Sequence, residues 1–133
     1  MSVFRRPPHE YGGSARPQVG PLLSDSKANL HTAADCLLRR DAPDDPALDY
    51  VALGLLVQDV RALARVGDAL ARRYLASLSS GRLTVVDGPF VGEEHVAVAT
   101  AVAALLRAID SCTDVERALT NAQICTSGLA IRR

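Results

Sequence analysis

The sequence contains no tryptophan, and aromatic residues of all kinds make up only 4% of the chain. Apolar residues nevertheless reach 48%, so any core must be built from leucine, valine and alanine. Long alanine-rich segments with little glycine or proline favour helices over sheets. The composition therefore predicts an all-α fold.

Charge of either sign is not in excess: the formal net charge is zero and the sequence pI is about 6.8. No overall field attracts nucleic acid or an anionic membrane. Lys27 is the only lysine in the sequence, whereas there are fourteen arginines. We attribute this skew to a GC-rich genome and expect a bacterial origin.

The three cysteines, Cys36, Cys112 and Cys125, have neither paired nor metal-binding spacing. An odd number argues against a disulfide framework, so we expect reduced thiols. No apolar run follows Arg5 and Arg6 as in a signal peptide, and the apolar run from Val96 to Leu106 is short for a membrane span. The expected location is the cytoplasm, with no membrane partner.

Residues 1–21 are rich in proline and glycine and show no periodicity, which predicts a flexible tail. We expect residues 22–133 to form a single helical domain. Its longest element is predicted from Asp45 to Ser79, with Asp45 as N-cap and Pro46 in the first turn. The apolar residues of this helix recur at helical spacing, except that residues 50–57 are apolar on every side.

Three shorter helices complete the predicted bundle. One begins near Ser24 or Ser26 and ends near Arg40, the next covers residues 93–110, and a capping-box match at Thr113 opens the last. The alanines of the 93–110 segment suggest that it is the most buried helix. Residues 82–92 between the long helix and this segment predict an extended loop or a small β-hairpin. The expected architecture is a four-helix bundle with one long central helix.

Sequence features of known catalytic classes are missing. No glutamate precedes a histidine with the spacing of a di-iron bundle, and the glycines of residues 88–92 lack the lysine and the hydroxyl residue of a phosphate-binding loop. We therefore predict no cofactor, no metal and no catalytic residue.

Two groups of residues are candidates for a binding site, although the sequence supports them only weakly. His95 lies on the apolar side of its predicted helix and Asp59 lies beside the leucines of the long helix. With Phe90 and the 82–92 loop they define a candidate site for a small ligand, and the alternative function is a small-ligand or metal-dependent helical-bundle protein. Arg61, Arg65 and Arg72 form a stripe that suggests weak nucleic-acid binding. Solvated or structural roles explain both groups more simply.

The function favoured by the sequence is self-association. The long helix would span roughly 50 Å at about 1.5 Å per residue, twice the length of each neighbour. Part of its apolar stripe is then left bare, which predicts a homodimer. The candidate interaction surface comprises Leu63, Leu70, Tyr74, Leu78, Ile124 and Ile131. We expect a protein-protein interaction or regulatory module, with the N-terminal tail or the 82–92 loop as a further contact for a protein partner.

Overall fold

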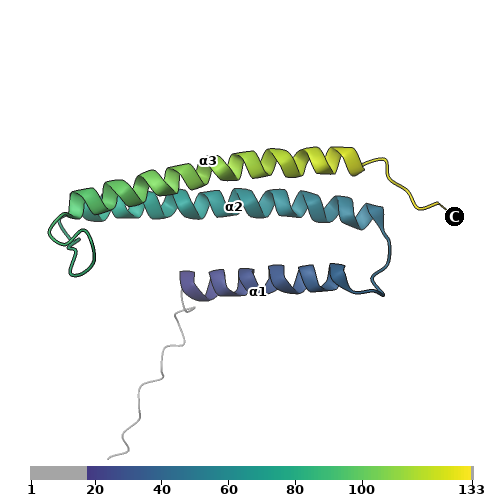
Figure 1. Ribbon diagram of the computed structural model, residues 1–133, viewed down its shortest axis with the longest axis horizontal. Coiled ribbons are helices and arrows are strands. Elements are labelled where there is room, and N and C mark those ends of the chain that lie inside the picture. The colour runs from purple at the N-terminus through teal and green to yellow at the C-terminus, as the bar shows by residue number, and fades with distance from the viewer. Residues whose placement is uncertain (1–17, 133) are drawn as a thin grey trace, which may run out of the picture. The chain divides into compact units, whose positions relative to one another are not determined.

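The computed structural model describes residues 18–132, which hold three helices and no strand (Figure 1). The helices are α1 (Val19–Leu38), α2 (Pro46–Ser79) and α3 (Glu94–Thr126). The all-α prediction is confirmed, whereas most of the predicted flexible tail lies outside the described residues. The chain divides into two units, residues 1–43 and 44–133, and each is described by itself.

Helix α1 begins at Val19, earlier than the predicted start near Ser24 or Ser26. Pro21 falls in its first turn, where the backbone N–H that proline lacks has no helical partner in any case. Proline at this position is compatible with a helix. Pro21 therefore did not mark the boundary between the predicted tail and the first helix. Leucines at positions 23, 30 and 37 recur every seven residues and give α1 an apolar stripe.

Helix α2 has the predicted start and a well-formed end. The Asp45 carboxylate accepts hydrogen bonds from the backbone N–H groups of Ala47 at 3.1 Å and Leu48 at 3.2 Å. At the other end Gly81 adopts a positive φ of 69°. The N–H of Gly81 then reaches the Leu78 carbonyl, and the N–H of Arg82 reaches the Ser77 carbonyl. These two bonds form a Schellman motif, which closes the helix.

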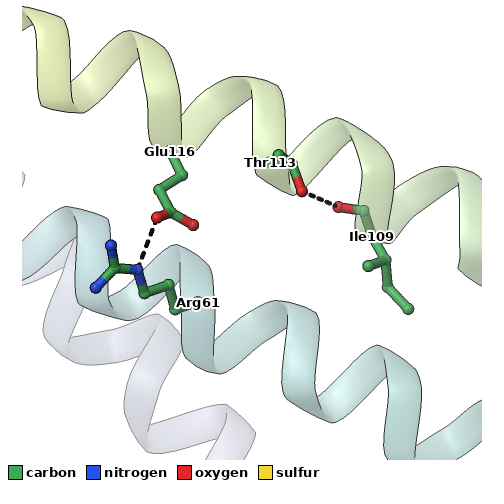
Figure 2. Close-up of polar contacts among 4 residues, drawn as sticks. All are labelled: Arg61, Ile109, Thr113 and Glu116. Atoms are coloured by element: carbon green, nitrogen blue, oxygen red, sulfur yellow. Dashed lines mark hydrogen bonds and ion pairs between the residues drawn. The ribbon is translucent and has the colours of Figure 1, made fainter.

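Helix α3 is continuous where two helices were predicted, so the four-helix arrangement within one chain is not observed in residues 18–132. Thr113 was expected to cap a new helix. Its hydroxyl instead donates to the Ile109 carbonyl at 3.4 Å, one turn back (Figure 2). A threonine bonded in this way is accommodated inside a helix. Because no glycine or proline lies between Glu94 and Thr126, nothing else interrupts the helix.

Helices α2 and α3 lie side by side and antiparallel, forming a helical hairpin (Figure 1). The Gln123 amide donates to the Tyr50 carbonyl at 3.1 Å near the open end. Further along, the Arg61 guanidinium meets the Glu116 carboxylate at 2.7 Å (Figure 2). Gly67 lies against Ile109, since a Cβ added to the glycine would be 3.4 Å from the isoleucine Cγ1.

The seam between the two helices follows a seven-residue repeat. On α2 it is marked by residues seven apart, Val57, Ala64, Ala71 and Leu78, all buried or half-buried. On α3 the spacing alternates between four and three residues, as in a coiled coil: Val98, Val102, Leu105, Ile109, Cys112, Glu116, Leu119, Gln123 and Thr126. Small α2 residues at the seam allow the two backbones to approach closely.

Few side chains are fully buried by this packing. Only Val57, Ala71 and Val98 fall in that class among the described residues. The prediction that the alanines of the 93–110 segment make it the most buried helix is wrong, because Ala99, Ala103, Ala104 and Ala108 remain exposed. One neighbouring helix can cover only one side of α3.

Residues 80–93 join the two helices as an irregular loop at one end of the hairpin (Figure 1). The loop contains no strand, so the predicted β-hairpin alternative is wrong. The Asp-Gly signal is used locally: the Asp87 carboxylate accepts from the Gly88 N–H at 2.7 Å, and Gly88 has a positive φ. Leu83, Val85 and Phe90 are half-buried, whereas the residues on either side of each are exposed.

The close approach at Gly67 generates the first prediction. Gly67→Ala should raise the free energy of unfolding by up to about 1 kcal/mol, because alanine is the better helix former and its Cβ meets Ile109 near van der Waals distance. Gly67→Leu should lower it by about 1–3 kcal/mol through overpacking. Urea unfolding followed by circular dichroism measures both. If the two variants had the same free energy of unfolding, the seam would not be closely packed around Gly67.

Candidate functional site

The predicted ligand residues do not come together. Asp59 lies two residues before Arg61 on α2, and Arg61 is level with Glu116. His95 lies in the first turn of α3. At about 1.5 Å per residue, the distance along α3 from His95 to Glu116 is roughly 30 Å. Both side chains are exposed. Phe90 shares only the loop end of the hairpin with His95, so the three residues form no common site.

No metal-binding cluster replaces this candidate. Within residues 18–132, no three or more histidine, cysteine or acidic side chains are placed to hold an ion. The three cysteines are free thiols, two of them exposed and Cys112 half-buried in the helix seam. The seam position explains Cys112 as a small apolar side chain.

The arginine stripe is largely neutralised by neighbouring carboxylates. Arg61 pairs with Glu116 at 2.7 Å, and Arg72 pairs with Asp68 at 2.9 Å one turn away. Arg65 lies on the same side of α2 and is exposed. Since two of the three guanidinium groups already have anionic partners, the stripe offers little free positive charge to a phosphate backbone.

Glu94 fastens the loop to the first turn of α3. The pKa of its carboxyl is held below the ordinary value of 4.5 by hydrogen bonds, first from its own backbone N–H and then from the Val85 N–H and the Thr84 hydroxyl. The Thr84 bond measures 3.4 Å. A carboxylate in the first turn is also favoured by the helix dipole. This cluster therefore has a structural role, because it positions the half-buried part of the loop.

A shallow cavity lies at the open end of the hairpin, with a volume of about 450 Å³. The N-terminal turn of α2 and the C-terminal turn of α3 form its walls. The lining residues are Pro46, Ala47, Tyr50, Val51, Thr126, Ser127 and Leu129. Tyr50, Thr126 and Ser127 bring hydroxyl groups to it, but no carboxylate, histidine or cysteine lines the cavity to activate a hydroxyl as a nucleophile.

The hairpin has one long side on which leucines and small residues gather. Leu56, Leu63 and Leu70 each precede a seam residue of α2 by one position. On α3 the residues that precede Val98, Leu105, Cys112, Leu119 and Thr126 by one position are Ala97, Ala104, Ser111, Ala118 and Cys125. Because the helices run antiparallel, both rows project from the same side of the pair. We call this side the leucine–alanine face.

Two exposed charged residues, Asp59 and Arg73, lie one helical turn from the leucines along the α2 edge of this face. The Arg61–Glu116 pair lies on the opposite side of the seam, together with Arg65, Asp68 and Arg72. Between the two rows of the leucine–alanine face, Leu53, Val60, Gly67, Ala101, Ala108, Val115 and Ala122 add further uncharged residues. Leu63 is 59% exposed and Val115 is 47% exposed. A largely apolar surface of this length is unusual on a monomer.

The predicted interaction residues divide between this face and other surfaces. Leu63 and Leu70 belong to the leucine–alanine face, and Tyr74 lies at its edge. Leu78 lies in the seam toward α3. Ile124, 64% exposed, projects away from α2, and Ile131 follows the end of α3. The structure therefore separates a set that the sequence presented as one stripe.

Helix α3 is also apolar enough, by length and composition, to cross a membrane: its most apolar eighteen residues have a mean hydropathy of 1.5 and only 6% of them are buried. The longest part of α3 without a charged residue runs from His95 to Leu106 and ends at Arg107. Polar seam residues such as Glu116 and Gln123 bond to α2.

The residue that sequence reasoning missed most clearly is Glu116, whose bond to Arg61 fixes the alignment of the two helices. The seven-residue repeat from Val98 to Thr126 is the signal that could have identified it, because the repeat continues through Thr113 without a change of phase. The same repeat also predicts that small residues seven positions apart lie in one row along α3.

No protein-family model matches the chain, and neither a curated protein nor a solved structure is similar enough to it to count as a match.

The Glu94 cluster predicts a dependence of stability on pH. Since the folded pKa is depressed, the carboxylate stabilises the fold above its unfolded pKa, and this contribution is lost as the pH falls through the folded value. Glu94→Gln should lower the melting temperature at pH 7, and the difference from wild type should disappear at acid pH. Glu93→Gln, one residue earlier and exposed, is the matched control. A difference that persists unchanged at pH 3 would contradict the assignment.

Proposed function

We propose that this protein is a non-enzymatic interaction module whose helical hairpin associates with a second copy of itself. The observation that carries the proposal is the largely apolar leucine–alanine face, which no element of the α2–α3 unit covers. Isologous pairing is the commonest way in which such a surface is buried, because one patch then covers another of the same kind.

The small core of the hairpin supports this proposal. Folding must offset a conformational-entropy cost of about 1–2 kcal/mol for each ordered residue. With only three fully buried side chains, a pair of long helices has little apolar burial to set against that cost. A second hairpin supplies the missing burial, so association and folding stabilise one another.

The open end of the hairpin also favours association. Leu48, Val51 and Leu55 of α2 are more than half exposed. Ile124 of α3 and Leu129, which follows α3, are also more than half exposed. These residues include part of the segment that the sequence showed to be apolar on every side. They offer a second apolar region, beside the leucine–alanine face, for contact with a partner.

The proposal predicts a mass of 28.2 kDa, twice the 14.1 kDa of one chain, in light scattering coupled to size exclusion at micromolar concentration. Leu63→Asp should shift this mass toward one chain, because it places a charge at the centre of the face. Gln58→Asp puts the same carboxylate on the opposite side of α2 and should leave the mass unchanged.

Circular dichroism of each variant separates loss of association from loss of folding. A wild-type mass of 14.1 kDa across the micromolar range would overturn the proposal. A dimer insensitive to Leu63→Asp would show that another surface, such as the open end, holds the copies together.

A further inference from the structure

We draw no further inference here: the strongest candidate, the leucine–alanine face of the α2–α3 hairpin, belongs to the self-association already proposed, and nothing in the structure shows which surface covers it.

Discussion

The structure depends on the contact between α2 and α3, and that contact is limited by geometry. Two helices can bury only the strip along which they touch. Here the strip includes Gly67, Ala64 and Ala71 on α2, so the backbones come close but little side-chain volume is enclosed. The consequence is a well-aligned hairpin with apolar sides that α2 and α3 do not cover for one another.

Polar bonds at the seam give this arrangement its specificity. Arg61 with Glu116 and Gln123 with the Tyr50 carbonyl tie the helices at two levels. An exposed ion pair of this kind contributes only about 0.2–1 kcal/mol. Its larger effect is on alignment, because a shift of the helices by one turn would separate both pairs. A fixed alignment brings the leucine and alanine rows into one surface with a defined pattern.

Local features of the fold followed well from the sequence, while the number of helices did not. Asp45 as N-cap and Gly81 beyond the helix end act through neighbouring backbone groups, so short motifs predict them. Thr113 shows the limit of this approach. The same four-residue motif caps a helix or lies within one, and the choice depends on whether the seam repeat continues across it. That repeat reflects contact with α2, which is tertiary information.

The candidate sites show the same division between local and tertiary signals. His95 and Asp59 each lie beside apolar residues of their own helix, which is all that the sequence shows. Only the pairing of α2 with α3 shows that the two residues are far apart. Leu63 and Leu70 were predicted as interaction residues from one helix, and the structure adds the small-residue row beside them. A surface made from two helices cannot be obtained from the periodicity of either alone.

The central claim is that burial of the leucine–alanine face is part of folding. The most direct test is the melting temperature of the wild-type chain as a function of its concentration. If two copies unfold together, mass action raises the melting temperature steadily as the concentration increases from the submicromolar to the hundred-micromolar range. A cooperative transition at the same temperature throughout that range would contradict the claim, because the hairpin would then be stable without a second copy.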